Sequence, residues 1–118
     1  MSDRLEQALS FANYRQTLNN QFHQVRTRAE SLLTVAKNGG NFVIDRELMC
    51  FLDMFARDGR TSIVLLDVNQ TPIEITDIPA FLKEITQRYF EVTNDYLAEY
   101  QTIRKSRSVK TIVDLKAE

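Results

Sequence analysis

The chain lacks the side chains from which most catalytic and metal sites are built. It contains one cysteine, Cys50, and one histidine, His23, in 118 residues. A single cysteine excludes an intrachain disulfide and a zinc site with several thiolate ligands. A lone histidine needs carboxylates or a thiol nearby for metal binding or catalysis, and local spacing places none beside His23. We therefore expect no enzyme activity, metal or cofactor, with His23 at the surface or at the edge of a helix contact and Cys50 in the core.

An excess of one charge and long apolar runs are also lacking. Lys and Arg number 15 against 16 Asp and Glu, which leaves a formal net charge of −1. Such a balance gives no overall attraction to nucleic acid or to an anionic membrane. No uninterrupted apolar run approaches the ~20 residues that span a bilayer, and the first residues show no secretion signal pattern. Because 43% of the residues are hydrophobic and 26% are charged, we expect one folded, cytoplasmic domain.

Two stretches of the chain place apolar residues alternately three and four positions apart, with one step of seven in each stretch. The positions are Ala8, Phe11, Leu18, Phe22, Val25, Ala29, Leu32 and Ala36 in the first stretch, and Ile78, Leu82, Ile85, Tyr89, Val92, Tyr96 and Ile103 in the second. This spacing gathers apolar side chains on one side of an α-helix. We expect a first helix that runs to Lys37, where Asn38 and the two following glycines stop it, and a last helix from Ile78 to about Lys105.

The segment between the two helices mixes short elements. Residues 41–44 form a short β-type run, and Asp45 then predicts the N-cap of a helix over residues 46–57. Residues 61–66 and 72–75 are rich in branched apolar residues and predict a β-hairpin, either alone or joined by the first run as a third strand. A lone hairpin is marginally stable in water, so we expect it to lie against a helix.

Two carboxylates, Asp67 and Glu74, lie on either side of the turn of this hairpin. General acid–base chemistry needs two carboxyl groups in a cleft with separated pKa values. Aspartate in a turn instead forms local hydrogen bonds. We therefore interpret Asp67 as a structural turn residue.

These elements predict an α+β fold. It has two long antiparallel helices, with a short helix and a small β-hairpin or three-stranded sheet at one end. Residues 1–108 are expected to form a single helical α+β domain, and residues 109–118 a C-terminal tail. Apolar residues remain on the flanks of the last helix and in the tail, which favours a homo-oligomer, most simply a two-fold dimer through the long helices.

Five residues are candidates for binding a protein partner. They are Tyr96, Tyr100, Ile112, Val113 and Leu115. Tyrosine combines a large apolar ring with a polar tip, as protein interfaces favour. A short apolar segment that follows a basic helix end can dock by strand addition or into a groove. We expect a non-enzymatic structural or adaptor protein that mediates protein–protein assembly through its helix faces and C-terminal tail.

An alternative function rests on the densest basic run of the chain. Arg104, Lys105, Arg107 and Lys110 lie just after the tyrosines of the last helix. Phosphate contacts by such residues, with aromatic stacking upstream, are typical of nucleic-acid binding. The alternative is therefore a nucleic-acid-binding or transcription/replication accessory protein.

Three segments of the chain resemble a known group of proteins. Residues 41–45, 62–75 and 107–115 look like parts of small accessory and virion-associated proteins of tailed bacteriophages. The resemblance implies an accessory, assembly or virion role, with a location in the host cytoplasm or in the virion. It supplies no catalytic residues.

Overall fold

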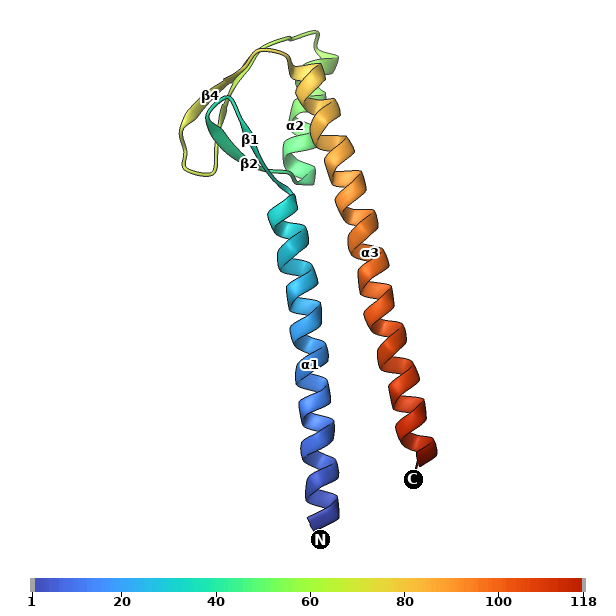
Figure 1. Cartoon of the computed structure of the whole chain (residues 1–118). Helices are drawn as coiled ribbons and strands as arrows, with labels where there is room; N and C mark the ends of the chain where they lie inside the picture. Colours follow the sequence, from blue (N-terminus) through green and yellow to red (C-terminus); the bar gives the residue numbers. More distant parts are fainter. Residues whose placement is uncertain (1, 118) are drawn as a thin grey trace. The chain divides into compact units, whose positions relative to one another are not determined.

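The described part of the chain folds into seven elements joined by short connections. The computed structural model describes the backbone of residues 2–117 and the side chains of residues 3–106. In chain order the elements are α1 (Ser2–Leu32), β1 (Thr34–Lys37), β2 (Gly40–Val43), α2 (Arg46–Arg57), β3 (Ile63–Leu66), β4 (Pro72–Ile75) and α3 (Ile78–Ala117) (Figure 1). The predicted α+β class is confirmed, with two long helices, one short helix and small antiparallel hairpins.

The described residues form two compact units. Unit 1 contains the part of α1 up to Arg28 and the part of α3 from Asp95 onward, and unit 2 is Ala29–Asn94. The predicted boundary after residue 108 falls inside α3, which continues as a helix to Ala117. The last residues are thus helical where we expected a tail, and their side chains lie outside the described part of the chain.

In unit 1, the residues of α1 and α3 run antiparallel. Three residue pairs join the helices: Arg28 and Glu99 in an ion pair with 3.3 Å between Nη2 and Oε2, Phe22 and Tyr100 with ring centroids 5.0 Å apart, and the Tyr14 hydroxyl donating to the Ser106 carbonyl at 3.5 Å. The numbers rise along α1 as they fall along α3, which confirms the predicted antiparallel order. Leu18 and Val25 are buried on α1, as the apolar spacing predicted.

The first helix ends earlier than we predicted. α1 stops at Leu32, and the residues expected to complete it form β1, which pairs with β2. Asn38 and Gly39 have φ values of 51° and 87°. Two consecutive positive φ values are what a two-residue hairpin turn requires, and Asn-Gly is its preferred sequence. The predicted helix stop is therefore a hairpin turn.

The short helix α2 has the limits that its sequence predicted. Asp45 Oδ1 accepts a hydrogen bond from the backbone N–H of Leu48 at 2.7 Å, which satisfies a donor at the helix start. The helix ends at Arg57, before Asp58. Leu52 is fully buried and Leu48 is half-buried, so α2 turns its predicted apolar face to the core.

The predicted hairpin is also present, but it forms its own sheet. β3 pairs with β4 in an antiparallel register, whereas β2 pairs with β1 and with no other strand of the described residues. The three-stranded alternative is therefore wrong. Individual hydrogen bonds link the two hairpins, among them Val68 N–H donating to the Asn41 carbonyl and Asn38 Nδ2 donating to the Glu74 carbonyl, each at 2.9 Å.

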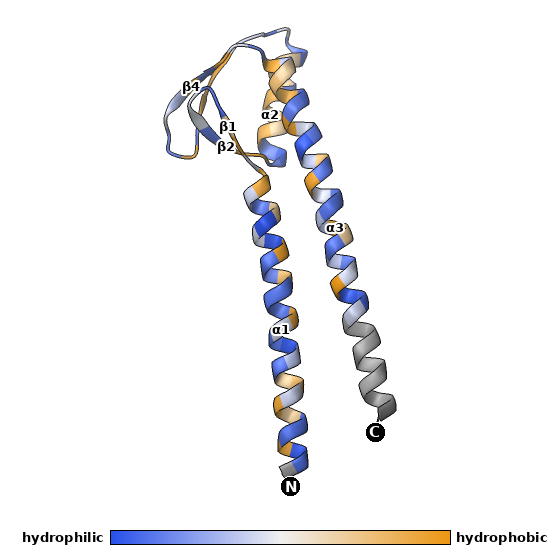
Figure 2. Ribbon diagram, in the orientation of Figure 1, coloured by the Kyte–Doolittle hydropathy of each residue, from blue (hydrophilic) through white to orange (hydrophobic). Residues whose placement is uncertain are grey.

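The core of unit 2 lies where its hairpins, α2 and the start of α3 meet. Figure 2 shows the hydrophobic colouring concentrated on these elements. The side chains with the least exposure are Phe81, Ile44, Leu52, Ile75, Ile78 and Ile85. Burying a side chain of this size stabilises a fold by about 1.5–3 kcal/mol. Both hairpins thus gain the apolar contact that neither has alone.

Candidate functional site

The two candidate tyrosines lie together in unit 1. The rings of Tyr96 and Tyr100 are stacked, with centroids 6.5 Å apart and planes at 18°, and Tyr100 also packs against Phe22 of α1. Tyr96 is half-buried and Tyr100 is 40% exposed. Part of the Tyr100 ring therefore stabilises the contact between the helices of unit 1, Tyr96 stacks on it within α3, and the rest of both rings stays accessible to another protein.

The other candidate residues lie further along the same helix. Arg104 and Lys105 are exposed on α3. The backbone of α3 also carries Arg107, Lys110 and the apolar candidates Ile112, Val113 and Leu115, whose side chains lie outside the described residues. The helix places all four basic residues within about two turns. The assigned roles of this set remain predictions.

Unit 1 exposes several large apolar side chains that the sequence analysis did not single out for binding. Leu5, Leu9 and Phe11 on α1 and Leu97 on α3 are between 53% and 63% exposed. The spacing argument placed Phe11 in the buried stripe, which is wrong. Of the three contacts between the helices described above, the one nearest the start of α1 is made by Tyr14, and the exposed Leu5, Leu9 and Phe11 precede it.

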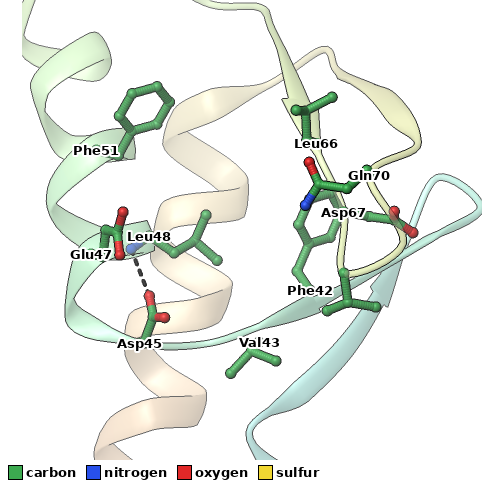
Figure 3. A pocket seen from close by; sticks show the side chains of 10 residues that line it. Phe42, Val43, Asp45, Glu47, Leu48, Phe51, Leu66, Asp67 and Gln70 are labelled. Carbon is green, nitrogen blue, oxygen red and sulfur yellow. Dashed lines mark hydrogen bonds between the residues drawn. The ribbon is translucent and has the colours of Figure 1, made fainter.

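A depression of about 470 Å³ opens on unit 2 between β2, the start of α2 and the end of β3 (Figure 3). Its lining residues are Phe42, Val43, Asp45, Glu47, Leu48, Phe51, Leu66, Asp67, Val68 and Gln70. Four of these, Val43, Phe51, Leu66 and Val68, are between 41% and 59% exposed. The lining includes three carboxylates and no Lys or Arg. Sequence reasoning missed this surface because its residues come from three separate elements.

Asp67 lies at the edge of this depression and has a structural role, as predicted. It is 6% exposed. Its Oδ1 accepts from the N–H groups of Asn69 and Thr71, each at 2.9 Å, and its Oδ2 accepts from the N–H of Asn41 at 3.2 Å. The bond from Thr71 is the largest cause of a lowered pKa for this carboxyl, against a smaller opposing effect of burial. The ionised side chain therefore organises the turn and joins it to β2.

Cys50 is exposed, which contradicts its predicted place in the core. It lies two residues before the buried Leu52, about 200° away around the helix. It lines a second depression of unit 2, of about 550 Å³, together with Met49, Asp53, Ala56, Pro79, Leu82, Lys83 and Thr86. A reactive thiol needs a cationic or helix N-terminal setting, and exposure alone does not provide one.

His23 is exposed on α1, as expected. Its Nδ1 lies 3.4 Å from Nη2 of Arg26. Within the described residues, no group of three or more His, Cys, Asp or Glu side chains is placed to hold a metal ion. In the same part of the chain, no helix combines the length and the apolar character needed to cross a membrane.

Comparison with known proteins adds no assignment to these surfaces. No family model, curated protein or solved structure matches the chain. The function must therefore be argued from the exposed side chains themselves.

Proposed function

We propose that this protein is a non-enzymatic structural or adaptor protein of phage origin that joins protein chains through its helix faces and the end of α3. The observation that carries the proposal is the exposure of Leu5, Leu9, Phe11 and Leu97 in unit 1. Leu5 and Leu9 lie four positions apart on the same side of α1, and adjacent exposed apolar side chains commonly mark protein–protein contact sites. In a pair of helices, each helix buries one stripe of apolar side chains, whereas a bundle of four helices encloses a full hydrophobic core. The natural occupant of the open stripes is a further helix from another chain.

The simplest such assembly is a homodimer. A two-fold axis lets the same face of both copies make the contact, so one set of exposed residues serves twice. The candidate residues Tyr96 and Tyr100 add partly exposed rings on α3 of the same unit. We place the assembly in the host cytoplasm or in the virion.

Sedimentation equilibrium of the full chain at micromolar concentration tests this proposal. We expect a dimer that is weakened at least about tenfold by the double substitution Leu5→Gln and Leu9→Gln. Each lost leucine contact removes about 1.5–3 kcal/mol, and about 1.4 kcal/mol corresponds to tenfold. The same experiment on a chain that ends at Ser108 tests the contribution of the last turns of α3.

The control is the pair Thr17→Ala and Gln21→Ala, which has the same spacing on exposed positions of α1, about 120° around the helix from the two leucines. It should leave the dimer unchanged. A wild-type chain that is monomeric at every concentration tested would contradict assembly through this face. An equal weakening of the dimer in both double variants would contradict it as well.

The second candidate function is nucleic-acid binding by Arg104, Lys105, Arg107 and Lys110. Its support is the exposure of the first two side chains and the continuous helix that carries all four residues. If four phosphate contacts form, affinity for a 20-bp DNA duplex should fall roughly 100-fold between 50 and 200 mM salt. Fluorescence anisotropy measures this change.

Charge reversal identifies the residues in that experiment. Arg104→Glu with Lys105→Glu should remove most of the binding, and Arg4→Glu with Arg15→Glu, an equal charge change at exposed positions of α1, should not. Binding that both variants lose equally would reflect net charge rather than a site.

A further inference from the structure

The two outer edges of the β3–β4 hairpin differ in the backbone N–H and C=O groups that they leave free for pairing. On β4, Pro72 has no N–H to offer, and the Glu74 carbonyl accepts a hydrogen bond from Asn38 Nδ2 at 2.9 Å. Val64 lies opposite Glu74 in the register, and Leu66 lies opposite Pro72. In an antiparallel pair, two opposed residues either both direct their N–H and C=O groups towards the partner strand or both direct them to the outer edges of the hairpin. Because the Glu74 carbonyl points outward, the N–H and C=O groups of Val64 and Leu66 also face the outer edge.

Within the described residues, the outer edge of β3 carries no charged side chain or proline. No other strand of the described chain pairs with it. Proteins usually protect edge strands with charged side chains, proline or a covering element. Here the edge residues Val64 and Leu66 are apolar and 62% and 59% exposed. The edge of β3 is therefore available as a template for another strand, whereas the edge of β4 is not.

The acidic depression of unit 2 lies on the β3 side of the hairpin. Leu66 and Val68 line it from this side, and no residue of β4 does. In Figure 3, Phe51 and Leu48 of α2 lie across the depression from Leu66. A strand added to β3 would direct alternate side chains to one face of the sheet. One of these side chains would reach the apolar residues Leu48 and Phe51 in the depression.

The charges around the depression decide which kind of chain fits. Asp45 and Glu47 lie at its α2 side, and Asp67 lies at the turn, with no Lys or Arg in the lining. A segment with Lys or Arg beside its apolar residues complements this potential. A second copy of unit 2 would instead bring the same carboxylates towards one another.

We propose that the outer edge of β3 binds an extended segment of a partner protein by strand addition. The segment carries apolar residues at alternate positions and at least one Lys or Arg. Its backbone pairs with Val64 and Leu66, one apolar side chain enters the depression, and a basic side chain lies near Glu47. This surface belongs to unit 2 and does not depend on the proposed assembly through the helices of unit 1.

Selection from a phage-displayed library of random nine-residue peptides on the full chain supplies the probe. We expect enriched peptides that alternate apolar and polar residues and include Lys or Arg. Enrichment of acidic peptides or of peptides with helical spacing would overturn the proposal, as would the absence of any enrichment. If no peptide is enriched and the Val64→Lys substitution dissociates a dimer of the full chain, this edge binds a second copy of the chain instead of an extended partner segment.

Backbone methylation of an enriched peptide tests strand pairing without altering the protein. Methylation of one alternate set of amides should weaken binding about tenfold or more, and methylation of the other set should have little effect, because only one set faces β3. Equal effects of the two sets would exclude strand addition.

A charge change on the protein tests the role of Glu47. Glu47→Lys should weaken the unmodified peptide about tenfold. Glu91→Lys, at an exposed position of α3 in unit 2, is the matched control and should leave the affinity unchanged. Equal loss in both variants would show that overall charge, rather than this edge, attracts the peptide.

Discussion

Replacing Asp67 with alanine should lower the melting temperature by about 10 °C, the largest effect we expect from any single polar substitution. The backbone N–H groups of Asn41, Asn69 and Thr71 all donate to this carboxylate. Removing it leaves three donors without their acceptor, and because these bonds are partly buried, their loss costs more than that of an exposed hydrogen bond. Thermal unfolding followed by circular dichroism measures the change. A melting temperature within 2 °C of wild type would show that the turn forms without this side chain.

The effect of Asp67 should depend on pH in one direction. Its pKa is lowered in the folded chain, first by the bond from Thr71. The folded state therefore favours the ionised carboxyl, and the resulting stabilisation is fully present above the unfolded pKa of about 3.9. It is lost as the pH falls through the lower pKa of the folded state. The difference in unfolding free energy between wild type and Asp67→Asn should thus be constant near pH 7 and shrink below about pH 4.

Denaturant titrations from pH 7 to pH 3 measure this dependence. Asp95→Asn, at an exposed position of α3, controls for the loss of one carboxyl group. A stability difference for Asp67→Asn that stays constant down to pH 3 would contradict the role of the ionised carboxylate.

Replacing Gly40 with alanine should reduce the free energy of unfolding by about 2 kcal/mol. An added Cβ would lie 2.6 Å from Cγ1 of Ile73 and 3.2 Å from Cβ of Asp67. Ile73 is buried and cannot move aside freely. Alanine restricts the unfolded chain and so stabilises by about 0.4–1 kcal/mol, but this gain is smaller than the cost of overpacking. Urea titration gives the net value.

A double-mutant cycle with Ile73→Ala identifies the cause of this loss. That substitution removes Cγ1 and Cδ1 of Ile73, the two closest atoms to the new methyl group, and leaves the contact with Asp67. Gly40→Ala should therefore cost less than half as much in the Ile73→Ala background. An equal cost in the two backgrounds would place the strain in the backbone of the hairpin rather than in this contact.

Short elements with strong local signals were predictable from the sequence. Asp45 and the Asp58-Gly59 pair bracket α2, and its limits are those predicted. The start of α3 at Ile78 was also predicted. In the structure, Asp77 Oδ1 accepts a hydrogen bond from the N–H of Ala80 at 3.1 Å, as an N-cap residue does. β1 was missed because Ala29, Leu32 and Ala36 continue the helical spacing. The Asn-Gly turn was the local signal that could have corrected this.

The candidate surfaces were only partly predictable. Tyr96 belongs to the apolar spacing of the last helix, and Tyr100 was chosen for its amphipathic side chain. The contact of Tyr100 with Phe22, however, joins residues far apart in the chain. The exposure of Leu5 and Leu9 depends on where α3 contacts α1, which no local pattern states. The acidic depression combines β2, α2 and β3, so its existence could not be deduced from any one of them.

The sequence by itself determined where most helices and strands begin and end, because caps, turns and side-chain periodicity act over a few neighbouring residues. Only the tertiary structure decided which apolar residues are covered, which edge of the β3–β4 hairpin is open, and that Asp67 joins two hairpins. These properties depend on contacts between distant residues. Periodicity shows that a face is apolar, but solvent exposure depends on what packs against that face.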